Sequence, residues 1–148
     1  MNREILFKAK RKDNGEWVEG SLVRSEDVDD DFKVIIIPLK ESWMYTEEYS
    51  NDIGFEGWYK VDPTTLCQFT GLVDKNGKKI WENDIVNRTD LHVVSEPSIG
   101  FIEYDLENTS FLIHWTNKVE YSPTYHWKDK LQVIGNIFDN PELLEVEQ

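Results

Sequence analysis

The run QFTGLVDKNGKKIWENDIV, Gln68 to Val86, decides the fold of this 148-residue chain. It alternates apolar and polar residues, as half-buried strands do, and it carries two turn signals, Asn76-Gly77 and Glu82-Asn83-Asp84. Asn-Gly favours the positive φ angles of a two-residue type I′ turn, which would pair Asp74 with Lys79. The stretch therefore predicts a hairpin, followed by a second bend that leads into a further strand at Ile85.

A second Asn-Gly dipeptide lies near the N-terminus, between the runs Ile5–Lys12 and Trp17–Arg24. Read as a two-residue turn, Asn14-Gly15 pairs Lys10 with Glu19. This register gathers the small and apolar side chains on one face and the lysines on the other. It therefore predicts a half-buried hairpin.

Further strand signals follow at short intervals, with little helix between them. Runs rich in β-branched or aromatic residues predict strands at Lys33–Leu39, Gly100–Tyr104, Ser110–Trp115 and Leu131–Phe138. Asn140-Pro141-Glu142 has the order of an N-cap, a first-turn proline and an acid, so a short helix is predicted there. We expect a mainly β fold in which antiparallel hairpins form a barrel-like or sandwich-like body, with a short C-terminal helix.

Length and composition suit one domain, or two small β subdomains of about residues 1–62 and 63–148. Only 39% of the residues are apolar, but six are tryptophan, and large aromatic side chains build a core from few residues. The single cysteine, Cys67, excludes an internal disulfide, and the sequence shows neither a signal peptide nor an apolar run of membrane-spanning length. We expect a cytoplasmic protein that does not enter a membrane.

The net charge of -13 is distributed unevenly along the chain. The first twelve residues are basic, residues 13–62 and 91–148 are acidic, and Ser25–Asp31 is the most acidic run. Nonspecific binding to nucleic acid depends on clustered Lys and Arg, so we expect no nucleic-acid partner. The acidic run itself is predicted to be an exposed loop, because its like charges repel one another.

Three segments together resemble the YopX family of bacteriophage and prophage proteins. They are REILFKA (3–9), the central run quoted above, and VIGNIFDNPELL (133–144). Family members usually have Tyr-Glu-Gly-Asp-Ile-Val where this chain has WENDIV (81–86). Asn replaces Gly there, and Asn tolerates a left-handed backbone best after Gly, which indicates a turn at Asn83. The resemblance implies a mainly β, phage- or prophage-encoded protein of the bacterial cytoplasm. It implies no reaction, and it suggests oligomerisation by analogy only.

The residue patterns of catalysis, cofactor binding and metal binding are missing from the sequence. Metal-ligand spacing is absent from the candidate residues His92, His114, His126 and Cys67. Glu82 and Asp84 are the best single candidates for acid–base chemistry, but carboxylates that accept backbone hydrogen bonds in a turn explain them more simply. We expect no enzyme activity, catalytic residue, cofactor or metal, and we assign a structural turn motif to Asn76, Gly77, Glu82, Asn83 and Asp84.

An aromatic-rich stretch offers a recognition surface instead. Its candidate residues are Trp43, Met44, Tyr45, Tyr49, Trp58 and Tyr59. Aromatic residues and Met are enriched in protein interfaces, but they are also ordinary core residues, so both roles stay open. If these side chains are exposed, we expect them to contact another subunit or a host or phage protein.

The leading functional hypothesis is a nonenzymatic phage accessory protein that binds another protein or assembles with itself. A second hypothesis is an acidic DNA mimic that inhibits a host DNA-binding protein, using the carboxylates of Asp27, Asp29, Asp30 and Asp31. A third is a small β-barrel that binds nucleic acid by stacking bases on its aromatic side chains. An enzyme is the remaining alternative.

Overall fold

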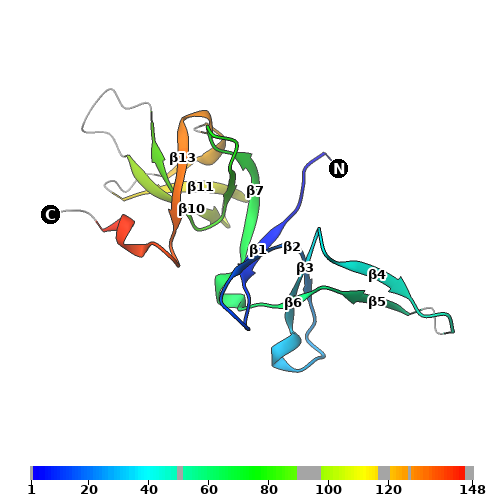
Figure 1. The fold of residues 1–148 in the computed structure, drawn as a ribbon. Coiled ribbons are helices and arrows are strands. Elements are labelled where there is room, and N and C mark those ends of the chain that lie inside the picture. The colour runs from blue at the N-terminus through cyan, green and yellow to red at the C-terminus, as the bar shows by residue number, and fades with distance from the viewer. Residues whose placement is uncertain (1, 50–51, 90–97, 117–120, 127, 146–148) are drawn as a thin grey trace. The chain divides into compact units, whose positions relative to one another are not determined.

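The computed structural model describes residues 2–49, 52–89, 98–116, 121–126 and 128–145, and Figure 1 shows their fold. The chain forms two compact units, Met1–Gln68 (unit 1) and Phe69–Gln148 (unit 2). Throughout the described residues the strands pair antiparallel and the helical segments are short 3-10 turns. The predicted mainly β fold is confirmed. Its sheets are open, and no barrel closes among the described strands.

Unit 1 is built on a sheet with the strand order β6-β3-β2-β1, followed by the start of β7. The strands are β1 Phe7–Lys10, β2 Trp17–Arg24, β3 Val34–Pro38, β6 Tyr59–Lys60 and β7 Cys67–Val73. A hydrophobic core cluster of this unit is formed by the buried side chains of Ala9, Val34, Ile36 and Val61. Half-buried apolar residues from β1, β2 and the segment before β7 pack against it.

The first hairpin forms at the predicted place but in a different register. Lys10 pairs with Trp17, whereas the sequence predicted Glu19. Side chains alternate along a strand with a period of two, so a shift by two residues leaves each side chain on its predicted face. The apolar face is therefore found as expected although the pairing was wrong.

The loop of this hairpin explains the shift. Only Gly15 has a positive φ, 73°, and Asn14 does not, whereas a type I′ turn needs two such residues. The Arg11 N–H instead donates to the Glu16 carbonyl at 2.9 Å, which leaves four residues in the loop.

The central hairpin also has a longer loop than predicted. The Asp74 N–H donates to the Lys78 carbonyl at 2.8 Å, so three residues form the loop. Gly77 is its left-handed residue, with a φ of 80°. The predicted pairing of Asp74 with Lys79 is wrong by one residue, because a three-residue loop places a single left-handed glycine after a type I turn.

Unit 2 contains a five-stranded sheet in the order β12-β11-β10-β9-β13. The strands are β9 Asp84–Arg88, β10 Ile99–Asp105, β11 Ser110–Trp115, β12 Tyr121–Pro123 and β13 Leu131–Asn136. β8, Lys79–Trp81, pairs with the later part of β7. The core joins side chains of β8 to those of the sheet and contains Ile80, Val86, Ile102, Ile113, Trp115, Leu131 and Val133.

The predicted C-terminal helix is a single 3-10 turn, η5 Pro141–Leu144. The Asn140 side chain does not cap it, contrary to the prediction. Its Oδ1 accepts a hydrogen bond from the Asn136 N–H at 3.3 Å, and its side chain lies against Gly135, where any Cβ would overlap it. Asn140 therefore ties the turn back to β13 instead of starting a longer helix.

The bend between β8 and β9 has the left-handed residue that the sequence predicts. Asn83 has a φ of 67°. Its N–H donates to the Ile102 carbonyl at 2.8 Å, and its carbonyl accepts from the Ile137 N–H at 3.0 Å. The bend is thus joined to β10 on one side and to the residue after β13 on the other.

Replacing Asn83 with alanine is expected to lower the free energy of unfolding by about 1 kcal/mol, because an L residue without a local hydrogen-bonding side chain is strained in the left-handed region. Asn83→Gly is the matched control and is expected to stay within about 0.5 kcal/mol of the natural chain. Urea titrations followed by tryptophan fluorescence measure both variants. Equal losses in the two would mean that the side chain of Asn83, and not its backbone conformation, matters.

Candidate functional site

The aromatic-rich stretch of unit 1 forms a two-stranded ribbon (the arm, residues 41–57). β4, Trp43–Thr46, pairs antiparallel with β5, Ile53–Glu56, and Figure 1 shows the two strands side by side, apart from the other strands of this unit. Every residue of β4 is exposed, and so are the apolar side chains of β5. Trp43 is 58% exposed, Met44 64% and Ile53 58%. The arm therefore presents apolar side chains that unit 1 does not cover.

The arm is held in shape at its base and along its length. At the base, Glu41 and Gly57 both have positive φ angles, 62° and 79°, and a Cβ on Gly57 would overlap the Glu41 carbonyl. Along the arm, the Tyr45 ring covers Gly54 on the opposite strand, where a Cβ would overlap the ring. A non-glycine residue held at positive φ costs on the order of 1 kcal/mol and persists only where its surroundings enforce it. The backbone at Glu41 is therefore fixed by its surroundings.

The six predicted interaction residues separate into two groups. The arm carries Trp43, Met44, Tyr45 and Tyr49, all of which are exposed, Tyr49 to 96%. Trp58 and Tyr59 are half-buried and follow the base of the arm. They line a cavity of about 720 Å³ (the pocket), whose other lining residues are Lys12, Asp13, Asp31 and Lys60.

One wall of the pocket combines cations with aromatic rings. The Asp31 carboxylate lies 3.2 Å from the Lys12 Nζ and 3.8 Å from the Lys60 Nζ. The Lys60 Nζ is 4.0 Å from the centroid of the Phe32 ring, and that ring packs against Trp58 with 5.9 Å between centroids. Two consecutive residues, an acid and an aromatic, therefore contact both lysines and the indole.

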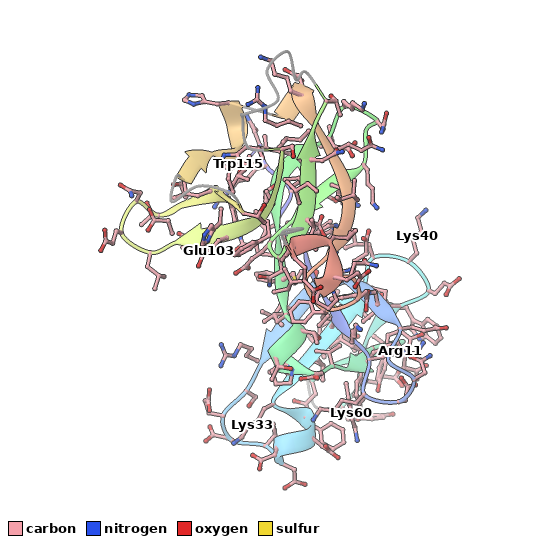
Figure 2. All side chains as sticks on the ribbon, turned by 90° about the vertical axis from the view of Figure 1, so that its left-hand side faces the viewer. Arg11, Lys33, Lys40, Lys60, Glu103 and Trp115 are labelled. Atoms are coloured by element: carbon pink, nitrogen blue, oxygen red, sulfur yellow. The ribbon has the colours of Figure 1, made fainter. Side chains whose placement is uncertain are left out.

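Arg11 adds a second cation–aromatic contact beside the pocket; Figure 2 labels this residue together with Lys60. Its guanidinium lies 4.0 Å from the centroid of the Tyr59 ring, and its Nε and a terminal nitrogen both donate to the Asp13 carboxylate. The side-chain hydrogen bond with Arg11 lowers the pKa of Asp13, and the same bond raises the pKa of Arg11. Both groups are therefore ionised at neutral pH.

In unit 2, Asp84 of the turn motif binds backbone. Asp84 is 2% exposed, and its Oδ2 accepts a hydrogen bond from the Trp81 N–H at 2.8 Å across the bend. Glu82 and Asn83, between them, are half-buried. The Asp84 carboxylate thus has the local bonding that turn chemistry predicts for this position.

Asp74, which the sequence analysis did not single out, also binds backbone N–H groups. It is 5% exposed and accepts from the N–H groups of Asn76 at 2.8 Å, Lys78 at 3.0 Å and Val133 at 3.0 Å. Burial acts to raise the pKa of Asp74, but the three N–H donors and the charge of Lys78 outweigh it, so this pKa is lowered. An Asp two residues before Asn-Gly is a turn signal that could have identified the local bonds, but not the bond to Val133.

The other chemistry-bearing side chains lie in separate places. Cys67 is buried at the start of β7. His114 is on β11 with its Nδ1 3.6 Å from the Glu103 Oε2. His126 is exposed at the end of the 3-10 turn η3, Thr124–His126, and His92 lies outside the described residues. Figure 2 labels Glu103 on unit 2. Within the described ranges, no group of three His, Cys, Asp or Glu side chains could hold a metal ion.

Comparison with known proteins identifies the family of this fold. The model of the family described as YopX protein matches residues 6–145. The chain belongs to the YopX family. Among solved structures, this YopX-family chain is similar to protein EF1440 from Enterococcus faecalis, known from its crystal structure. The identity is 25%, 97% of this chain and 100% of that chain are covered, and the TM-score is 0.60.

The resemblance seen in the three sequence motifs is therefore confirmed, and the match extends over the segments between them. No curated protein matches the chain. Across the part of the chain that the structure describes, no helix combines the length and apolar character needed to cross a membrane.

Replacing Asp74 with alanine is expected to lower the free energy of unfolding by at least about 2 kcal/mol, because each buried N–H left without an acceptor costs about 1–3 kcal/mol. Urea titration of the full chain measures the loss. Asp129→Ala, at an exposed aspartate of the same unit, is the control and is expected to change stability by less than about 0.5 kcal/mol.

The contribution of the Asp74 charge is expected to depend on pH. Its pKa in the folded chain lies below the ordinary value of 3.8, so the stabilisation is complete above that value and is lost as the pH falls through the folded pKa. The stability difference between the natural chain and Asp74→Asn should therefore shrink as the pH falls from about 5 to about 2. A difference that stays constant over this range would contradict the role of the charge.

Proposed function

We propose that this protein is a phage- or prophage-encoded accessory protein of the bacterial cytoplasm that works without catalysis, by binding another protein through the arm. One observation carries the proposal: both strands of the arm expose their apolar side chains. Water-exposed apolar surface is costly, and contiguous patches of it mark interaction sites. The family membership supports the phage setting.

The architecture of the arm supports a protein as the partner. Among the described strands, β4 and β5 pair only with each other, so each has an edge of backbone N–H and C=O groups open to another strand. Two-stranded ribbons are marginal alone in water and gain stability from added strands or packing. A protein partner supplies both a strand edge and an apolar face, which is the mode known as β-augmentation.

The charge of the arm narrows the chemistry of that partner. Between residues 40 and 57 there are five acidic residues and one lysine. These acids keep an apolar ribbon soluble and repel polynucleotides. The arm therefore suits a protein surface that is apolar at its centre and basic at its rim.

The two alternatives raised by the sequence have less support. A DNA mimic needs unpaired surface carboxylates, but Asp30 lies 2.7 Å from the Lys33 Nζ, and Asp31 is engaged with Lys12 and Lys60. A small nucleic-acid-binding barrel needs a closed or nearly closed sheet, and the described sheets are open.

Polar substitution of the arm is expected to abolish binding without unfolding the protein. The variant Trp43→Ser/Met44→Ser/Ile53→Ser removes three exposed apolar side chains, while Leu106→Ser, at a residue 83% exposed in unit 2, is the matched control. Tagged full-length protein is used to capture partners from lysogenic bacteria, and its mass is measured by light scattering. A partner, whether a second copy or another protein, should bind the natural chain and the control at least about tenfold more tightly than the triple variant.

Two results would contradict this proposal. The first is a natural chain that stays monomeric and retains no protein. The second is an identical set of retained proteins for all three forms, with circular dichroism showing that each is folded.

A further inference from the structure

We propose that the partner of the arm is a second copy of the chain, and that the tip of the arm, Glu47 to Tyr49, enters the pocket of that copy. This inference rests on the proposed function and deepens it by naming the partner and the surface that receives the arm. Three features favour a second copy: the groups that contact one side of the pocket, the groups at the arm tip, and the charges of the two surfaces.

The residues that line the pocket already contact groups of the kind that the pocket is proposed to receive. Asp31 contacts the lysines at positions 12 and 60, and Phe32 lies under the Lys60 ammonium and against Trp58. The ligand chemistry shown by the molecule itself is thus a carboxylate followed directly by an aromatic ring. Cavity space of about 720 Å³ remains beside this contact, which is within the usual range for a ligand pocket.

The tip of the arm displays the same two groups in the same order. Glu48 is exposed, and Tyr49, which follows it, is 96% exposed, the highest value among the large apolar and aromatic side chains. The Glu47 N–H donates to the Asp52 carbonyl at 3.0 Å and so holds the two strands together at the start of the tip. A tyrosine ring of this exposure is hardly covered by the described residues of its own chain, so little contact with them is lost on binding.

A pocket cannot receive the arm of its own chain. Trp58 and Tyr59 directly follow the base of the arm, whereas the tip lies beyond the last strand pair, Thr46 with Ile53. The first pair, Trp43 with Glu56, is three residues nearer the base, so the tip is at least about 10 Å farther along an extended ribbon. The contact is therefore between copies.

The charges of the two surfaces are complementary. The four charged residues that line the pocket, Lys12, Lys60, Asp13 and Asp31, balance in charge, and Arg11 beside them adds a positive charge. The arm, residues 41–57, carries five acids and no basic residue. Attraction between exposed charges is screened by salt, so the assembly should weaken as ionic strength rises.

The test is a charge exchange in the full-length protein. Light scattering and sedimentation at low salt give the mass and the dissociation constant of each form. The forms are the natural chain, the arm variant Glu47→Lys/Glu48→Lys, the pocket variant Lys12→Glu/Lys60→Glu, and the chain that carries all four substitutions. Glu107→Lys/Glu142→Lys reverses two exposed acids of unit 2 and is the matched control.

The natural chain and the control are expected to assemble, and each double reversal should weaken assembly at least roughly tenfold. The chain with all four substitutions should recover most of the affinity, because its reversed arm meets a reversed pocket. Recovery of this kind is specific to a direct contact, since two independent kinds of damage would add. If Lys12→Glu/Lys60→Glu fails to fold, Lys12→Gln/Lys60→Gln removes the same charges without placing acids beside Asp31, and it should weaken assembly as well.

A monomeric natural chain, an assembly that neither folded reversal weakens, or a combined variant that recovers nothing would overturn the inference. These outcomes are distinguishable from failure of the proposed function. If the natural chain is monomeric but captures a different protein through Trp43, Met44 and Ile53, the proposed function stands and only the second copy is wrong. If those apolar substitutions also leave binding unchanged, both the proposed function and the inference of a second copy are wrong.

Discussion

The buried carboxylate of Asp74 is the interaction on which the arrangement of unit 2 depends. A protein of short strands has many backbone N–H groups at bends where no strand partner is available, and each one must find an acceptor. Asp74 serves two of these groups in its own loop and a third on β13, 59 residues away in the sequence. The Lys75 N–H reinforces the link by donating to the Leu131 carbonyl at 3.0 Å. One side chain thus shapes a hairpin and places β13, whose Leu131 and Val133 enter the core.

Unit 1 buries some of its apolar side chains and exposes others. Its sheet buries a small apolar core, yet the chain between β3 and β6 forms an arm whose apolar side chains are exposed. Such an element would be a liability in an isolated monomer, because exposed apolar edges promote unspecific pairing. The positive φ angles at Glu41 and Gly57 show a defined conformation at its base. A segment held in this way and lined with acids suits the proposed binding to one surface, since acids along a ribbon suppress unspecific pairing.

Much of the fold was predictable because strand alternation is a local property. The strands Trp17–Arg24 and Ser110–Trp115 have the predicted limits, and Asn83 revealed its bend because so few residues accept a positive φ. The Asn-Gly loops were predicted wrongly for a local reason: the dipeptide allows either one or two left-handed residues, and the hydrogen bonds of the flanking residues decide between them.

Contacts between distant parts of the chain were not predictable in this way. Asp74 could not be recognised in full, because one of its partners comes from β13. Trp58 and Tyr59 of the pocket were among the predicted interaction residues, but the pocket as a whole could not be recognised. Its other residues come from the β1–β2 loop, the acidic run and the end of β6, and no period or spacing relates them. The aromatic stretch shows the same limit, since its residues differ in exposure although they share a composition.

The presence of Asp31 in the pocket sets how strongly an arm can bind there. An incoming carboxylate must either share the two lysines with Asp31 or displace it, and exposed ion pairs are worth only about 0–1 kcal/mol each. One arm in one pocket is therefore a weak contact, and most of its strength must come from burying Tyr49 against the rings of Trp58 and Tyr59. Because each chain carries both an arm and a pocket, two copies that exchange arms make the second contact within an existing complex, at a high effective concentration. Exchange of this kind closes into a symmetric pair, whereas a one-way contact would continue from copy to copy. In the proposed assembly, the acidic run in unit 1 would compete with the arm, which would keep each contact reversible and make stable assembly depend on both contacts forming together.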